Sequence, residues 1–115
     1  MATRLRELAA PSPSVLAAIA NHFDGDARLY RAFATSCAEQ FAHDAAAGGA
    51  ACDAGDLAAL RRLAHNLKSA LTMLGHDELF AVAEKLESEA AMGDLPSATA
   101  SWRALRAGLS RLQSP

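Results

Sequence analysis

Apolar side chains recur every three or four residues along most of the chain, the spacing that places them on one face of an α-helix. The pattern begins at Val15 and pauses at Asp24-Gly25-Asp26, which predicts a short first helix, a turn, and a capping role for Asp26. A second apolar stripe then runs through Leu29, Phe33, Cys37, Phe41, Ala45, Gly48 and Cys52. Because its phase survives Gly48-Gly49, we predict one long helix, with a break at these glycines as the main alternative.

Three further striped segments follow. Gly55 is expected to end the second helix and Asp56 to cap the start of the third, so the third helix is predicted from Leu57 to Leu74. The fourth ends at Gly93-Asp94, and the fifth opens with Pro96 in its first turn, where proline is tolerated. Four long helices joined by short turns predict an all-α fold, an antiparallel up-and-down four-helix bundle with a short extra N-terminal helix.

The domain organisation follows from two prolines and from the length. Pro11 and Pro13 oppose a continuous helix, so residues 1–14 are predicted to form a flexible N-terminal arm. Residues 15–115 would then form a single helical domain, because a chain of 115 residues can bury one core without metals or disulfides.

Charge and cysteine content narrow the possible partners. Eleven Lys and Arg against thirteen Asp and Glu give a formal charge of −2, so we expect neither nucleic acid nor a membrane surface as a partner. Cys37 and Cys52 lie fifteen residues apart on one predicted helix, too far for a disulfide, and are expected to be reduced core residues. With no apolar run long enough for a membrane span or a signal peptide, we expect a cytoplasmic location.

The third helix carries the residues of chemical interest. Stepping about 100° per residue gathers its leucines in one sector, and His65 lies roughly 150° from the centre of that sector. We therefore expect an exposed imidazole, which is a usable nucleophile at neutral pH. Lys68, one turn on, could supply positive charge to an incoming phosphoryl group. The same polar face holds four candidate partner-binding residues, Arg61, Arg62, Ser69 and Thr72, of which the arginines suit a partner with an acidic pocket.

The segment His65-Asn66-Leu67-Lys68-Ser69, with Gly75 ten residues after the histidine, resembles the signature of histidine-containing phosphotransfer domains. Residues 55–57, 60–64 and 83–87 are also similar to that family, and the resemblance covers roughly residues 26–112. It implies that His65 is the phosphoacceptor and Lys68 the residue that stabilises the phosphoryl group. Ser69 matches the small residue beside the acceptor, where glycine is commoner, and Gly75 matches the glycine that ends the acceptor helix.

The resemblance also implies a function. Such a module takes a phosphoryl group from the aspartyl phosphate of one receiver domain and passes it to another, and a hybrid sensor kinase is an open possibility as a further partner. The magnesium ion belongs to the receiver, so we expect no cofactor here. We expect a monomeric phosphocarrier without an ATP-binding or kinase site, and we find no second general acid or base in the sequence that would cluster with His65.

Two alternatives remain open at this point. One is the dimerisation and phosphoacceptor domain of a sensor kinase, which usually has an acidic residue directly after its histidine and a proline a few residues on. Here Asn66 follows His65, and no proline appears before Pro96. The other is a helical adaptor that docks a receiver without being phosphorylated.

The remaining polar residues offer no second site. His22, His43 and His76 lack the ligand spacings of a di-iron or zinc site, so no metal is expected. Trp102 falls on a core stripe of the fifth helix. Five polar residues are predicted to form the solvated side of the fourth helix: Glu84, Lys85, Glu87, Ser88 and Glu89.

Overall fold

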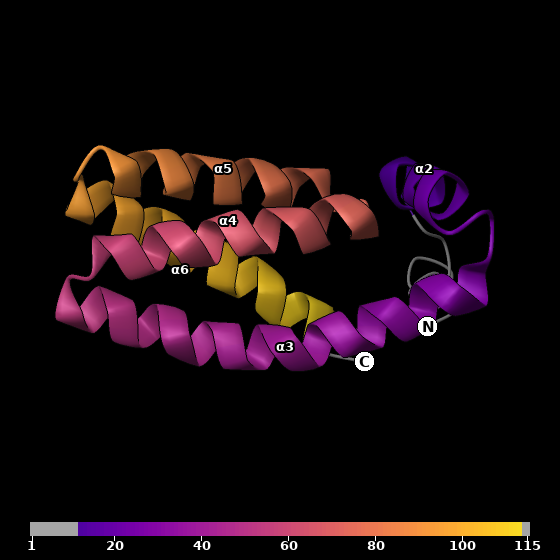
Figure 1. Ribbon diagram of the computed structural model, residues 1–115, viewed down its shortest axis with the longest axis horizontal. Helices are drawn as coiled ribbons and strands as arrows, with labels where there is room; N and C mark the ends of the chain where they lie inside the picture. The colour runs from indigo at the N-terminus through magenta and orange to yellow at the C-terminus, as the bar shows by residue number, and fades with distance from the viewer. Residues whose placement is uncertain (1–11, 114–115) are drawn as a thin grey trace, which may run out of the picture.

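The computed structural model describes residues 12–113, and within that range the chain forms five helices and no strand (Figure 1). They are α2 (Pro13–His22), α3 (Ala27–Ala54), α4 (Leu57–Leu74), α5 (Asp77–Ala91) and α6 (Leu95–Gln113). The predicted all-α class is confirmed. Helix α2 begins at Pro13, inside the segment assigned to a flexible arm, and residues 1–11 of that segment lie outside the described residues.

The four longer helices enclose a helical-bundle core. Helix α4 packs against α3 and α5, while α6 packs against α5 and α3, and a smaller contact joins α4 and α6. Helix α2 contacts α4 and lies beyond the end of that helix (Figure 1). The most deeply buried large side chains come from α3 to α6: Phe41, Leu60, Leu71, Leu74, Leu86, Trp102, Leu105 and Leu109.

Helix boundaries follow the capping residues that the sequence supplies. The Asp26 carboxylate accepts hydrogen bonds from the backbone N–H groups of Arg28 and Leu29 at 3.0 and 3.1 Å, and that of Asp56 accepts from Ala59 at 3.0 Å. Helices α3 and α4 end at glycines with positive φ, Gly55 and Gly75. The predicted third helix and both caps are therefore confirmed.

Helix α3 is continuous through Gly48-Gly49, as predicted. Gly48 is buried against the indole of Trp102, which leaves no room for a Cβ atom at that position. Trp102 itself is 2% exposed, which confirms its place in the core. Glycine lowers the stability of a helix relative to alanine. At Gly48 the close packing of α6 offsets this loss, and helix propensity alone does not take such packing into account.

One part of the apolar stripe on α3 was predicted wrongly. Leu29 is 55% exposed, and Tyr30 is buried in its place. The Tyr30 hydroxyl donates a hydrogen bond of 2.6 Å to the carbonyl of Leu74, and its ring packs edge-on against Phe23. Burial raises the pKa of Tyr30, so the phenol remains a donor well above neutral pH. This bond ties the last turn of α4 to the start of α3.

Candidate functional site

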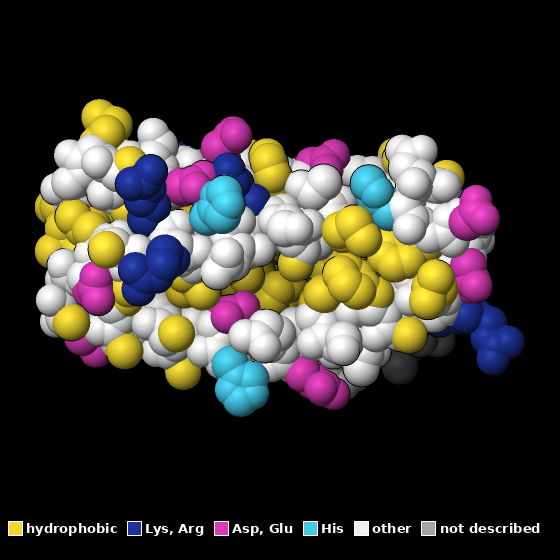
Figure 2. All heavy atoms as spheres, viewed as in Figure 1, with side chains coloured by type: hydrophobic (Ala, Val, Ile, Leu, Met, Phe, Trp, Pro, Cys, Tyr) yellow, Lys and Arg dark blue, Asp and Glu magenta, His cyan; other side chains and the backbone are white. Residues whose placement is uncertain are grey.

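The outer face of α4 carries the exposed histidine. Leu60, Ala64, Leu67, Leu71 and Leu74 turn the opposite face of the helix into the core. His65 therefore points outward with 70% of its side chain exposed, which confirms the expectation from the helical phase. Figure 2 shows a histidine beside Lys or Arg side chains on this face. The four predicted partner-binding residues are also exposed: Arg61, Arg62, Ser69 and Thr72.

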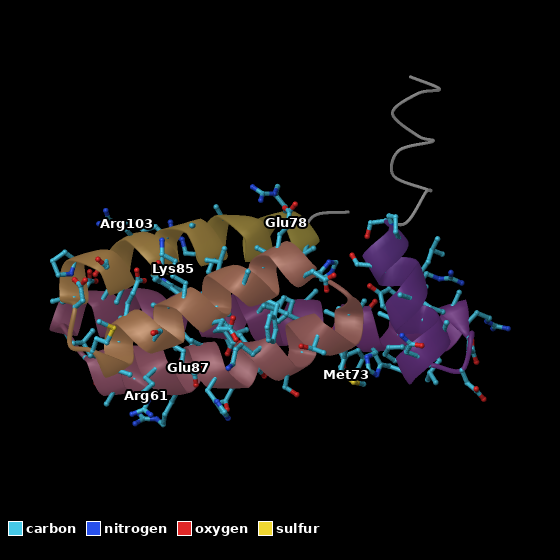
Figure 3. All side chains as sticks on the ribbon, turned by 90° about the horizontal axis from the view of Figure 1, so that it is seen from above. Arg61, Met73, Glu78, Lys85, Glu87 and Arg103 are labelled. Carbon is cyan, nitrogen blue, oxygen red and sulfur yellow. The ribbon has the colours of Figure 1, made fainter. Side chains whose placement is uncertain are left out.

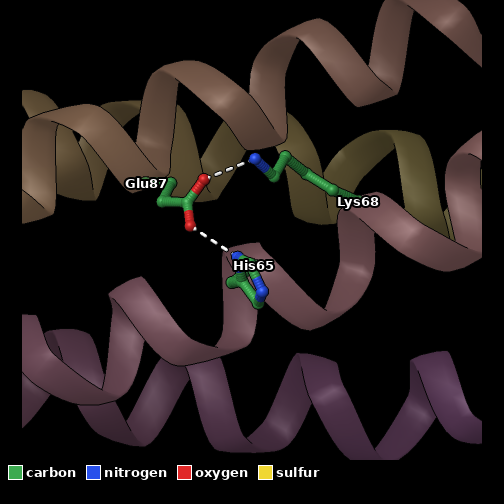
Figure 4. A network of polar contacts seen from close by, with 3 residues as sticks. All are labelled: His65, Lys68 and Glu87. Carbon is green, nitrogen blue, oxygen red and sulfur yellow. Dashed lines mark hydrogen bonds and ion pairs between the residues drawn. The ribbon is translucent and has the colours of Figure 1, made fainter.

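A carboxylate from α5 connects His65 with Lys68. Oε2 of Glu87 lies 2.8 Å from Nδ1 of His65, and Oε1 lies 2.6 Å from Nζ of Lys68 (Figure 4). The side chains of Lys68 and Glu87 are each only 22% exposed. One bridging side chain therefore fixes two residues of α4 that lie almost one helical turn apart.

This contact defines which ring nitrogen of His65 is available. An ionised carboxylate can only accept hydrogen bonds, so Nδ1 must be the donor that carries the proton. In a neutral ring, Nε2 is then the unprotonated nitrogen. Figure 4 shows this second nitrogen pointing away from Glu87. The imidazole thus presents a free lone pair to the outside of the molecule.

The electrostatics of the site favour an ionised Glu87. Its pKa lies below the ordinary value, first because Lys68 donates a hydrogen bond to it and second because His65 does. The Lys68 ammonium also lies 5.9 Å from the centroid of the Phe80 ring, another residue of α5. In the structure Lys68 is therefore held against α5.

A groove runs between α4 and α5 beside the histidine. It has a volume of about 630 Å³, and apolar residues from both helices line part of it. Arg61, Arg62 and His65 line the same groove, so the structure brings the predicted basic rim and the histidine together. Figure 3 shows Arg61 and Glu87 toward the same edge of the molecule. Thr72 lines a different hollow, between α2 and the end of α4.

Two sequence-based expectations about α5 are wrong. Glu87 was assigned to a solvated face, and no acid or base was expected beside His65, but its carboxylate contacts the imidazole. Glu89 is also half-buried, and it accepts a hydrogen bond of 2.5 Å from the hydroxyl of Ser101. Glu84, Lys85 and Ser88 are exposed as predicted. The one available signal was that Glu87 adjoins the apolar stripe of α5, which continues through Leu86.

The other histidines form no comparable site. His22 and His43 are exposed, and His76 is half-buried at the start of α5. Burial lowers the pKa of His76, with Asp77 opposing that shift. Within residues 12–113, no group of three or more His, Cys, Asp or Glu side chains is arranged to hold a metal ion. No helix in this part of the chain is both long and apolar enough to cross a bilayer.

Comparisons with known proteins agree with the motif on α4. A family model described as Hpt domain matches residues 5–115, nearly the whole chain. Comparisons with curated proteins and with solved structures give no match. The resemblance based on His65, Lys68, Ser69 and Gly75 is therefore confirmed at the level of the family.

Proposed function

Since the chain belongs to the Hpt domain family, whose members are histidine phosphotransfer modules of two-component phosphorelays, we propose that His65 is the residue that carries its phosphoryl group. Modules of this family are phosphocarriers that interact with the receiver domains of response regulators. The observation that carries the proposal is the outward-facing Nε2 of a side chain that is 70% exposed. A receiver can reach that nitrogen without any rearrangement of the core.

The proposed step is an in-line displacement at phosphorus. The lone pair of His65 Nε2 attacks the phosphorus of an aspartyl phosphate on the receiver. The N–P bond forms as the bond from phosphorus to the aspartyl oxygen breaks, and the aspartate leaves as a carboxylate. The proton on Nδ1 stays in its hydrogen bond with Glu87, which faces the positive charge that develops on the ring. The reverse step transfers the phosphoryl group to a second receiver.

The neighbours of His65 suit a docked receiver. Arg61 and Arg62 line the groove beside it, where they complement an acidic pocket. Ser69 is a small exposed side chain one turn further along α4, so it leaves the imidazole uncovered. We propose that the receiver supplies the magnesium ion and that this chain supplies the nucleophile on a rigid helix.

Several finer expectations remain proposals. We infer that α3 to α6 form an antiparallel up-and-down bundle, because short turns join consecutive helices that pack side by side. The direct contact of Lys68 with the phosphoryl group, the monomeric state, a hybrid kinase as a partner and the cytoplasmic location stay predictions. Light scattering measures the oligomeric state.

Phosphoryl loading of a histidine variant tests the assignment. The protein is mixed with a ³²P-labelled receiver domain, and His65→Gln is compared with His43→Gln, which alters an exposed histidine on α3. We expect label on the wild type and on the His43 variant, and none on the His65 variant. Undiminished label on His65→Gln would contradict the proposal. Receiver binding without any phosphohistidine would support the adaptor alternative instead.

A further inference from the structure

Two hollows of unlike charge flank the helix that carries His65. On the side of α5 is the groove that Arg61 and Arg62 line, and on the other side a smaller hollow lies between α3 and α4. Asn66 lines both of them. We propose that the hollow between α3 and α4 receives an arginine side chain of the docked receiver domain, and that Asp44 recognises it. This inference rests on the proposed function and adds a feature of the partner.

The hollow between α3 and α4 combines buried apolar residues with polar ones. Three buried residues form its floor: Cys37, Phe41 and Leu67. Three polar residues line it as well: Gln40, Asp44 and Asn66. Its volume is about 170 Å³, whereas a water molecule takes about 30 Å³ in the liquid, so a side chain of a partner has room to enter.

Asp44 brings an unpaired negative charge to this hollow. Its Oδ1 accepts a hydrogen bond of 3.2 Å from Nε2 of Gln40, which leaves the side-chain carbonyl of Gln40 as a further acceptor. Both ion pairs between described residues belong to Glu87, so no cation in that part of the chain neutralises Asp44. The hollow therefore offers acceptors and a negative charge.

An arginine side chain matches this combination of groups. Its guanidinium carries five N–H donors in a planar fork and has no acceptor, so it can bond to the Asp44 carboxylate and to the side-chain carbonyls of Gln40 and Asn66 together. The aliphatic stem of the arginine would cover the apolar floor, as long cationic side chains commonly do. A lysine ammonium is a compact charge and lacks the planar fork that fits a carboxylate.

The two hollows together give the docking face a direction. Arg61 and Arg62 make the α5 side positive, and Asp44 makes the α3 side negative. Figure 2 shows side chains of both signs around a histidine on one face of the molecule. A receiver that turned by half a rotation over His65 would bring like charges together, so the charges favour one orientation of the complex.

Transfer kinetics separate docking from chemistry. Transfer from the ³²P-labelled receiver is timed at rising receiver concentration and low salt. We expect Asp44→Asn to raise the half-saturating concentration about tenfold and to leave the maximal rate unchanged, because the carboxylate acts on docking and not on the reacting nitrogen. Asp53→Asn makes the same chemical change at an exposed position on the opposite face of α3, and it should match the wild type. An unchanged half-saturating concentration in Asp44→Asn would overturn the role of Asp44.

Filling the hollow tests whether a side chain enters it. Ala70 is half-buried and lines the hollow, so Ala70→Met occupies the space without a change of charge. We expect this variant to keep its helical circular dichroism and to dock more weakly at both low and high salt, because steric exclusion is not screened. Docking of folded Ala70→Met at the wild-type concentration would overturn the occupancy of the hollow.

Charge reversal identifies the side chain of the receiver. Each exposed arginine and lysine of the receiver is changed to glutamate and tested against the wild type and Asp44→Arg. We expect one arginine substitution to weaken docking to the wild type and to restore docking to Asp44→Arg. Rescue at a lysine would overturn the choice of arginine, and the absence of any rescue would overturn the contact.

The outcomes distinguish this inference from the function on which it rests. Every Asp44 variant should still take label at a saturating receiver concentration, because His65 is intact. Failure of the docking predictions leaves the assignment of His65 in place, provided that His65→Gln takes no label. Label on His65→Gln would instead remove the phosphoacceptor role itself.

Discussion

Glu87 and Glu89 lie two residues apart on α5, yet they contact different helices. Glu87 faces α4, where it bonds to an imidazole that is 70% exposed. Glu89 faces α6, where it accepts a hydrogen bond from Ser101, a residue that is only 6% exposed. The first contact leaves a nucleophile open to solvent, whereas the second joins two helices in a part-buried setting.

The difference extends to the two sides of the bundle. On the side of α6, Trp102 packs against Gly48 and Leu79 packs against Gly108, so backbones approach closely. On the side of α4, a groove of about 630 Å³ remains between the helices. The close contacts of α6 with α3 and α5 involve buried and half-buried apolar side chains, whereas the outer face of α4 carries the exposed His65. The bundle is thus closely packed where α6 meets α3 and α5, and it is open in the groove beside His65, between α4 and α5.

The largest effect is expected where α3 meets α6. Gly48→Ala places a Cβ atom on the Trp102 indole, which is 2% exposed and cannot move aside, so stability should fall by about 1–3 kcal/mol. Gly49→Ala meets no neighbouring atom and should raise stability by up to about 1 kcal/mol, because alanine favours helix. Urea unfolding measures both. Equal stabilities of the two variants would show that Trp102 does not pack tightly against Gly48.

A smaller effect is expected at the part-buried hydrogen bond. Glu89→Ala removes the partner of the Ser101 hydroxyl and should cost about 1 kcal/mol of stability, while phosphotransfer stays at the wild-type rate. Glu87→Ala should give the opposite result, with slower transfer and little change in thermal unfolding. Glu84→Ala serves as the control for both. Slow transfer in Glu89→Ala would show that phosphotransfer depends on both carboxylates and not on Glu87 alone.

The smallest effect is expected at acidic pH, in the contribution of Glu87 to the stability of the fold. The pKa of Glu87 lies below 4.5, chiefly through Lys68, so its contacts stabilise the fold above pH 4.5 and that contribution is lost as pH falls through the lowered pKa. Carbon-13 NMR of the carboxyl should show its midpoint rising toward 4.5 in Lys68→Gln. A midpoint that does not respond to this substitution would contradict the bond between Lys68 and Glu87.

The sequence was a good guide wherever local chemistry decides the structure. The bounds of α4 follow from Asp56 at one end and Gly75 at the other, and the exposure of His65 follows from helical phase. The continuity of α3 through Gly48 could also be predicted, because the apolar phase is uninterrupted there. These features depend on residues within one or two turns of each other.

Features that depend on contacts between helices could not be predicted in this way. Glu87 lies 22 residues from His65, and a helical wheel of α5 places it among polar neighbours without showing which helix stands opposite. Tyr30 was missed for the same reason, since its hydroxyl is satisfied by the Leu74 carbonyl 44 residues away. Leu29 was then assigned the buried position that Tyr30 occupies.

The uninterrupted course of α3 limits how this chain can change its length during evolution. Each inserted or deleted residue rotates the following part of a helix by about 100°. A single insertion between Tyr30 and Gly48 would therefore separate the phenol from the Leu74 carbonyl or the glycine from the Trp102 indole. Insertions and deletions among homologous sequences are expected instead at the turn around Gly93, which is exposed and has open space around it.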